Sequence, residues 1–299
     1  MAPTIPQMPA LSTSHASAVR PVSFRGQPAL QLQLPPGDAA IVALQGAQVL
    51  SWVTANGTER LYLSPRSVFD GYTAIRGGVP VCFPQFNQRG PLAKHGFARN
   101  LPWRVMDEGL SDSGTAVRAV LALDHSEQTR HWWPHGFAAR LAVVLRPGGL
   151  RMELSVQNTG STAWDFTAAL HSYLSVLDIA QTHLHGLEGC ARWDAVADVR
   201  GVQTGPVRFD GEYDSVFAAA ASPLRIDGTA GPALRLSQSA NWHNTVVWNP
   251  GAVLSERLAD MPDDGYRHML CVEAAVVEQP VPLAPGERWT GWQDIEILT

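Results

Sequence analysis

Two titratable side chains stand in surroundings that suggest proton-transfer chemistry. Glu273 lies in the apolar run Met269–Val277, which reads MLCVEAAVV. A lone carboxylate is expensive to bury, so it must be either paired or tuned for chemistry. If the sequence AALHSYL around His171 forms a strand, this histidine shares one face with Ala169 and Tyr173. A carboxylate and an imidazole can act as base and acid. On spacing alone, however, a hydrogen-bonded histidine on a half-buried strand is the simpler explanation of His171.

A second stretch, Ile75–Trp103, carries charge of one sign. Its strongly basic side chains are Arg76, Arg89, Lys94 and Arg99. It also holds His95 and no acid, whereas the whole chain has a net charge of −5. A cationic segment on an acidic protein indicates an anionic ligand of modest size. Its glycines and prolines exclude a long helix and favour a loop–strand–loop element whose backbone comes close to other groups.

Other polar residues admit two interpretations each. Two histidine pairs have spacings that could chelate a metal ion: His131 with His135, and His183 with His185. Neither pair has a cysteine or carboxylate at ligand spacing, so we expect surface or turn histidines and no bound metal. Asp214, in the sequence GEYDSVF, either caps its own backbone or holds a ligand.

Composition narrows the class of protein. The chain has 299 residues, of which 45% are hydrophobic and 16% charged, so a large core is available. Three widely separated cysteines without a C-x-x-C motif argue against a disulfide framework and for a reducing, cytoplasmic location. No apolar run approaches the ~18 residues that span a membrane. Neither a phosphate-binding loop nor a dinucleotide fingerprint occurs, so we expect no nucleotide cofactor.

The elements that must position these residues are mainly strands. Alternating or β-branched patterns predict strands at 29–34, 117–123, 141–145, 150–156 and 289–298. A tight hairpin is expected at Arg146-Pro-Gly-Gly, and short helical turns near 64–71 and 254–261. Many short strands broken by Gly and Pro turns are typical of an all-β antiparallel sandwich. Residues 1–22 contain no acid and no apolar block, which predicts a loose tail before a single domain at 23–299.

Several motifs resemble one known family, the glucose-6-phosphate 1-epimerases, which are hexose-6-phosphate mutarotases of the aldose 1-epimerase superfamily. In chain order they read RGGVP, FPQF, HGFAR, LHSYL, VVWNP and CVE. The resemblance runs from about residue 30 to the C-terminus. It implies a fold similar to galactose mutarotase, which is a large antiparallel supersandwich.

The resemblance also implies roles for the candidate catalytic residues. Glu273 matches the family's catalytic glutamate and is expected to act as the base. His171 matches the catalytic histidine and is expected to act as the acid. His95 is a second pocket histidine that would hydrogen-bond the sugar and could share the acid role. Asp214 would hold a sugar hydroxyl. Trp248 and Asn249 could line the sugar pocket, where the indole would stack on the pyranose, although a place in the core would also explain Trp248.

The phosphate is assigned to the cationic segment. Arg76 and Arg99 match the family's arginines, and guanidinium groups grip phosphate oxygens bidentately. Lys94 stands where some members of the family have glutamine, so it could add charge at the phosphate in place of a contact to a hydroxyl. Arg89 is expected to be a solvated loop residue.

The implied activity is interconversion of the α and β anomers of hexose 6-phosphates, chiefly glucose 6-phosphate, by acid–base ring opening and closure. No cofactor is required. The alternatives are an aldose 1-epimerase for neutral sugars, a non-catalytic sugar-phosphate-binding protein on the same fold, and a lectin-like module. We expect a monomer whose partner is a small hexose 6-phosphate, with no nucleic-acid or membrane partner.

Overall fold

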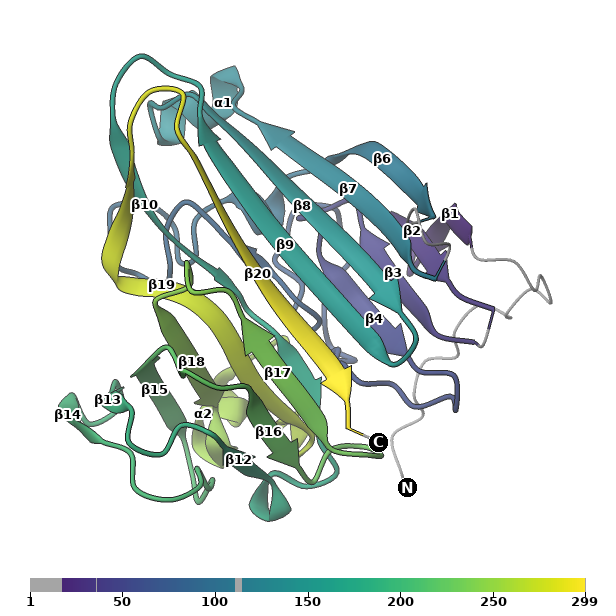
Figure 1. Cartoon of the computed structure of the whole chain (residues 1–299), viewed down its shortest axis with the longest axis vertical. Helices are drawn as coiled ribbons and strands as arrows, with labels where there is room; N and C mark the ends of the chain where they lie inside the picture. The colour runs from purple at the N-terminus through teal and green to yellow at the C-terminus, as the bar shows by residue number, and fades with distance from the viewer. Residues whose placement is uncertain (1–17, 36, 111–114, 299) are drawn as a thin grey trace.

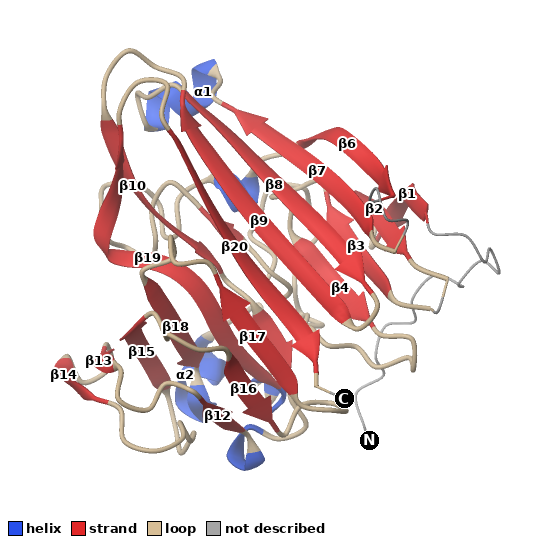
Figure 2. Ribbon diagram, in the orientation of Figure 1, coloured by secondary structure: helices blue, strands red, loops and turns tan. Residues whose placement is uncertain are grey.

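Strands dominate the computed structural model, which describes residues 18–35, 37–110 and 115–298 (Figures 1 and 2). Three sheets account for them, and all the recorded strand pairs are antiparallel. The first sheet keeps chain order: β1 (Ala18–Phe24), β2 (Gln27–Gln33), β3 (Ala39–Ala43) and β4 (Val49–Val53).

The second sheet, which we call the site sheet, runs in the order β14-β13-β15-β18-β19-β10-β5, with β11 also paired to β19. Its strands are β5 (Val81–Cys82), β10 (Trp164–Leu170), β11 (Tyr173–Ser175), β13 (Ala191–Asp194), β14 (Val199–Val202), β15 (Tyr213–Ala218), β18 (Asn244–Asn249) and β19 (Met269–Leu283).

The third sheet, the long sheet, runs in the order β12-β16-β17-β20-β9-β8-β7-β6. Figure 1 shows its longest strands lying side by side across the front of the molecule. Its strands are β6 (Arg104–Leu110), β7 (Val117–Asp124), β8 (Phe137–Arg146), β9 (Gly149–Asn158), β12 (His183–His185), β16 (Leu224–Asp227), β17 (Leu234–Gln238) and β20 (Arg288–Ile297).

The main core forms where faces of the three sheets meet. Val42 on β3, Leu154 on β9 and Val272 on β19 are all buried in one hydrophobic cluster. Side chains alternate across a strand, so the neighbours of Val272 face the other way. Cys271 on that opposite face belongs to a separate, smaller cluster with Tyr173. The site sheet is therefore covered on both faces, and the functional residues lie on the face away from the main core.

The predicted all-β antiparallel fold is confirmed, and each of the five predicted strands is present. The predicted hairpin joins β8 to β9, where Arg146 faces Gly149. The predicted boundary between the tail and the domain lies too far along the chain, because residues 18–22 already belong to β1 and pair with β2. Residues 1–17 of that tail lie outside the described residues, and the single domain stays a prediction.

Helices are short in the part of the chain that the structure describes. They are α1 (Glu127–Trp132), α2 (Gly251–Arg257), and the 3-10 helices η1 (Ala98–Asn100), η2 (Ile179–Gln181) and η3 (Gly265–His268). The turn predicted near 254–261 overlaps α2, whereas 64–71 forms turns and bends. The capping box that starts α1 joins Ser126 to Thr129, not to the usual Glu or Gln, so its sequence signal is weak. None of the described helices is long and apolar enough to cross a membrane.

Two adjacent glycines explain how the cationic segment enters the fold. Gly77 and Gly78 have φ values of 115° and 60°, in the region that only glycine adopts readily. A Cβ on Gly78 would overlap the carbonyl oxygen of Val49 and lie 3.0 Å from the Cα of Leu50. The backbone of the cationic segment therefore passes directly against β4 just after Arg76.

We expect Gly78→Ala to destabilise the fold more than Gly57→Ala. Gly57 also has positive φ, at 81°, but a Cβ there would meet nothing within 4 Å. The Gly57→Ala control should lower the free energy of unfolding by about 1–2 kcal/mol, because alanine disfavours the left-handed backbone conformation. Gly78→Ala should lower it by roughly 1–3 kcal/mol more, because the added Cβ overlaps the backbone of β4. Urea unfolding measures both, and equal losses would contradict the close-packing explanation.

Candidate active site

Strand register brings the predicted catalytic and sugar-binding residues to one face of the site sheet. Asp214 on β15 is directly opposite Trp248 on β18, and Trp248 is opposite Cys271 on β19. Cys271 is in turn opposite Tyr173 on β11. Glu273 follows Cys271 by two residues, so the same face carries it. Residues far apart in sequence thus form one surface.

His171 lies in the two-residue break between β10 and β11, not within a strand as predicted. Its backbone N–H donates to the carbonyl of Pro80 at 3.0 Å, which replaces the missing ladder bond. Its imidazole stacks on the phenol ring of Tyr173, with centroids 4.7 Å apart and planes 9° from parallel. The prediction that His171 and Tyr173 share a face is confirmed, and the stacking limits the orientation of the imidazole.

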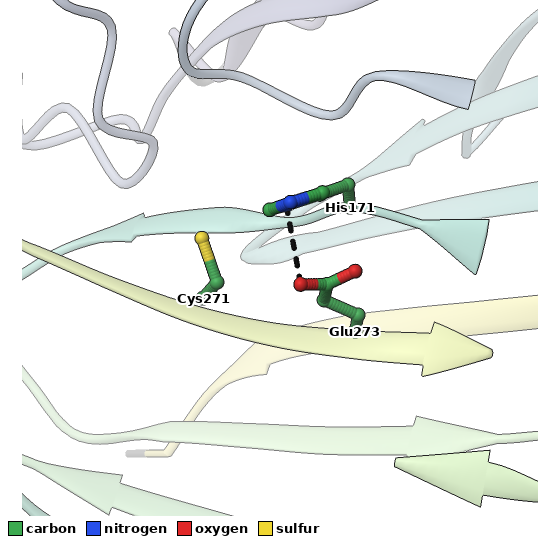
Figure 3. Close-up of side chains that lie close together, drawn as sticks. All are labelled: His171, Cys271 and Glu273. Atoms are coloured by element: carbon green, nitrogen blue, oxygen red, sulfur yellow. Dashed lines mark ion pairs between the residues drawn. The ribbon is translucent and has the colours of Figure 1, made fainter. Parts of the chain in front are cut away.

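The imidazole and the carboxylate meet directly (Figure 3). His171 Nδ1 lies 3.3 Å from Glu273 Oε1, and the side chains are 9% and 1% exposed. Among the described residues, His171 Nδ1 and Glu273 Oε2 have no hydrogen-bond partner. Buried polar atoms are normally satisfied, so unpartnered ones at the same place indicate a site that waits for a polar ligand.

Burial shifts the two groups in opposite directions. Desolvation, reinforced by the negative charge of Asp214, raises the pKa of Glu273 well above its usual range. Desolvation, followed by the electrostatic effects of His95, Arg99, Arg76 and Lys94, lowers the pKa of His171 well below its usual range. Both shifts favour the uncharged form. In the unliganded pair, the proton that the two groups can exchange therefore lies on the carboxyl. The imidazole beside it is neutral, so the site does not hold two opposite charges.

His95 stands beside this pair on the segment that covers the sheet face. Its ring lies 5.4 Å from that of His171, at 68°. Nδ1 of His95 accepts a hydrogen bond from the backbone N–H of Asn87 at 3.3 Å, which leaves Nε2 to carry the proton of the neutral ring. Burial first, then Arg99, Lys94 and Arg76, lower the pKa of His95 to about 2. It is thus a neutral hydrogen-bond donor.

The covering segment is held by one buried amide. Nε2 of Gln85 donates to the carbonyls of Asn87 and Leu92 at 3.0 and 3.1 Å, and Oε1 accepts from the N–H of Leu92. His95 has a φ of 67° and its N–H bonds Asn87 O at 2.9 Å. The loop is therefore rigid enough to fix the position of His95 despite its many turns.

The predicted phosphate-binding residues lie near the catalytic pair. Arg76, Lys94 and Arg99 all act electrostatically on both His95 and His171. Nη2 of Arg99 donates to the carbonyl of Lys94 at 2.9 Å, and its buried Nε has no partner among the described residues. Lys94 is exposed. The three cations supply unused donors to an anion.

Arg76 is the most constrained of these cations. Its Nε donates to Asp260 Oδ1 at 2.9 Å and its Nη1 to the hydroxyl of Tyr173 at 3.3 Å. Its guanidinium carbon lies 6.0 Å from the centroid of the Trp248 ring. Asp260 and Tyr173 were not identified from the sequence, because each is separated from Arg76 by about a hundred residues or more.

Some of the remaining candidate residues lie at the site, and others support the fold. Burial raises the pKa of Asp214 to about 6, with Lys94 opposing the shift. Trp248 is half-buried, and its ring centroid lies 6.0 Å from that of His171. Asn249, beside it, is instead fully buried and donates to two backbone carbonyls, so it serves the fold. Arg89 is exposed as predicted, but its guanidinium lies 4.3 Å above the ring of Trp193.

One group of side chains could hold a metal ion among the described residues. Ligand atoms of His171, Cys271 and Glu273 lie within 4.8 Å of one another. The pairs His131/His135 and His183/His185 form no such three-ligand group there. His185 instead lies 3.2 Å from Asp227 at the edge of the long sheet.

Comparison with known proteins places these features in context. A family model described as aldose 1-epimerase matches residues 28–296. Two relatives are named as candidate glucose-6-phosphate 1-epimerases. The one from Cenchrus ciliaris is 37% identical over 260 residues, which cover 84% of this chain and 79% of the relative. The one from Salmonella typhimurium is 40% identical over 256 residues, or 82% of each chain.

A solved structure agrees with the sequence relatives. The crystal structure of a candidate mutarotase from Salmonella typhimurium superimposes with a TM-score of 0.85 at 32% identity, over 94% of each chain. The likeness therefore extends over nearly the whole of both chains.

We expect Glu273→Gln to stabilise the protein at alkaline pH. The folded-state pKa of Glu273 is raised, so its contribution to stability is full below the unfolded value and is lost as pH rises through the folded value. The advantage of the glutamine variant should grow above pH ~4.5, by up to about 1.4 kcal/mol per pH unit.

Urea unfolding between pH 4 and pH 9 measures this difference. The exposed Glu256→Gln on α2 is the matched control and should show no such slope. A stability difference for Glu273→Gln that stays constant with pH would mean that the buried carboxyl is ionised at every pH tested.

Proposed function

This chain belongs to the aldose 1-epimerase family, and we propose that it interconverts the α and β anomers of hexose 6-phosphates, chiefly glucose 6-phosphate. The observation that carries the proposal is the buried His171–Glu273 pair, with unpartnered atoms on both side chains. It lies within electrostatic reach of three cations. An acid–base pair suits the sugar ring, and the cations suit the phosphate.

The reaction needs only proton transfers. In the proposed mechanism Glu273 removes the proton of the anomeric hydroxyl while His171 protonates the ring oxygen. The ring opens to an aldehyde, the carbonyl turns about its bond to the next carbon, and the ring closes on the other face. When the ring closes, Glu273 returns a proton to the anomeric oxygen and His171 takes one back from the ring hydroxyl. The pair therefore returns to its starting state without a cofactor.

Substrate binding would prepare this pair for the reaction. Before binding, burial favours a neutral carboxyl and a neutral imidazole. Hydrogen bonds that a sugar donates to a carboxylate favour its charged form. The proton of Glu273 can then pass to His171 Nδ1, 3.3 Å away. The result is a carboxylate base beside an imidazolium acid, as the assigned roles require.

The sugar would be held by groups around the pair. His95 Nε2–H donates to a ring or hydroxyl oxygen, and Asp214 accepts from a hydroxyl across the sheet face. The half-buried Trp248 ring offers an apolar surface to the pyranose. Asp260 and Tyr173 orient the guanidinium of Arg76, while Arg99 Nε remains unpartnered. Arg76, Arg99 and Lys94 therefore make a fitting phosphate site.

We further propose that the chain acts as a monomer in the cytoplasm. Its three cysteines, Cys82, Cys190 and Cys271, are all free in the structure. Free buried thiols are typical of a reducing compartment. Analytical ultracentrifugation of the purified protein would measure the oligomeric state directly.

The first test concerns the acid and the base. Glu273→Gln and His171→Asn should each lower kcat by at least ~10², the order expected for loss of a positioned proton-transfer group. Exchange spectroscopy by NMR on glucose 6-phosphate measures the rate. The exposed His243→Asn is the matched control and should leave the rate unchanged. Near-normal exchange by either folded variant would refute the assignment.

The second test separates phosphorylated from neutral sugars. Charge-assisted hydrogen bonds contribute about 1.5–3 kcal/mol each, so two arginines could favour the phosphorylated sugar by roughly two to four decades in kcat/KM. Arg76→Ala or Arg99→Ala should remove much of this preference by harming glucose 6-phosphate, with the slow reaction of glucose nearly unchanged. Higher ionic strength should raise the KM for glucose 6-phosphate more than that for glucose.

Arg89→Ala is the matched control for charge, because it removes one cation from the same exposed segment. We expect it to change the preference by less than about threefold, as for a screened charge. If the wild-type protein turns over glucose as well as glucose 6-phosphate, the arginines are structural and the activity is that of a neutral-sugar mutarotase.

A further inference from the structure

Cys271 is a third chemical group beside the catalytic pair, and the proposed mechanism does not use it. It precedes Glu273 by two residues on β19, so the two side chains lie on the same face of the strand. Figure 3 shows its sulfur directed to the same space as the imidazole and the carboxylate. One ligand atom from each of His171, Cys271 and Glu273 lies within 4.8 Å of the others, and all three residues are buried.

The unsatisfied atoms of this cluster point to a ligand. His171 is 7% exposed and Glu273 is 1% exposed. Nδ1 of the first and Oε2 of the second have no hydrogen-bond partner among the residues described. Leaving buried polar atoms unpaired costs free energy. A metal ion bound by the imidazole, the thiol and the carboxyl group would give the His171 nitrogen a partner and would use the carboxyl group as a ligand.

The spacing of the cluster is close to that of a zinc site. Zinc bonds of ~2.0–2.3 Å in a tetrahedron put ligand atoms ~3.3–3.8 Å apart. The 3.3 Å between His171 Nδ1 and Glu273 Oε1 already meets this requirement. With all separations within 4.8 Å, the Cys271 sulfur needs to move by about 1 Å. The fourth position would stay open to water or a hydroxyl.

The charge balance also favours a divalent ion with a thiolate. Binding would release one proton from the Cys271 thiol and one from the Glu273 carboxyl, and the two resulting negative charges would neutralise Zn²⁺. A neutral complex is far easier to bury than an isolated charge. The nearby cations Arg76, Lys94 and Arg99 oppose the ion, whereas Asp214 favours it.

We propose that His171, Cys271 and Glu273 form a zinc-binding site that inhibits the enzyme by occupying both catalytic groups, and that Cys271 makes the protein sensitive to zinc. The inhibitory part rests on the proposed function. The binding part does not, since it depends only on the geometry of the three side chains.

The binding test uses Co²⁺ as a spectroscopic substitute for zinc. Titration of the purified protein at pH 8 should produce thiolate-to-cobalt charge-transfer absorption in the near ultraviolet, which excess Zn²⁺ abolishes. Cys271→Ala should lack this absorption. Cys82→Ala removes another fully buried cysteine of the site sheet and should retain it. No absorption in the wild type, or equal absorption in both variants, would overturn the site.

The activity test follows anomer exchange of glucose 6-phosphate against Zn²⁺, with each variant normalised to its own metal-free rate. Zinc should inhibit the wild type, and a chelator should restore the full rate. Loss of a supporting contact to a metal ligand typically weakens binding 10–100-fold, so loss of the sulfur ligand itself should raise the inhibitory concentration by at least ~10². Equal inhibition of wild type and Cys271→Ala would refute the proposal.

A surface site is the main competing explanation for zinc inhibition. His185→Ala removes the pair that His185 forms with Asp227 on β12 and β16. Inhibition lost in His185→Ala and kept in Cys271→Ala would contradict the proposed site. If the protein catalyses no anomer exchange at all, the proposed function fails, and the cobalt titration still decides whether the metal site exists.

Discussion

The arrangement of this protein depends on one interaction, the exchange of a proton between the carboxyl of Glu273 and the imidazole of His171. Both groups are buried on one face of the site sheet. Charged forms of Glu273 and His171 are costly at this depth, which is why both pKa shifts favour neutral groups. The pair is nevertheless left with unpartnered atoms. This combination is unfavourable for stability and useful for proton transfer, because a substrate can supply the missing hydrogen bonds and thereby move the proton.

Such a pair can be maintained only by a rigid framework. β19 holds Glu273 in the middle of the site sheet, with β18 and β10 on either side. The break between β10 and β11 releases His171 from the ladder, while Pro80 and Tyr173 hold its backbone and ring. Strand register places Glu273 and the contacts of the break place His171, so no local motif sets the 3.3 Å separation between the two side chains. If β19 shifted its register by one residue, the side chain of Glu273 would point into the main core.

Under the proposed function, the cationic segment would connect phosphate binding to proton transfer. Arg76, Lys94 and Arg99 lower the pKa of His171 and His95 in the unliganded protein. A bound phosphate would neutralise much of that positive charge, and so raise the tendency of His171 to accept a proton. In the proposed mechanism, the residues assigned to the phosphate would therefore also tune the acid. Arg76 in addition contacts Tyr173, which stacks on His171.

Periodicity and composition determined the fold class, since alternation of apolar residues marks strands such as β2 and β9 without reference to the rest of the chain. A glutamate in an apolar run and a segment of like charge were also visible as local anomalies. The position of His171 in a break, the partnership of Arg76 with Asp260 and the approach of Cys271 were decided by tertiary structure alone. The contacts of Arg76 with Tyr173 and with Asp260, for example, join segments that are 97 and 184 residues apart. Local sequence specifies which face a side chain takes, whereas strand register and the packing of distant segments decide what it meets there.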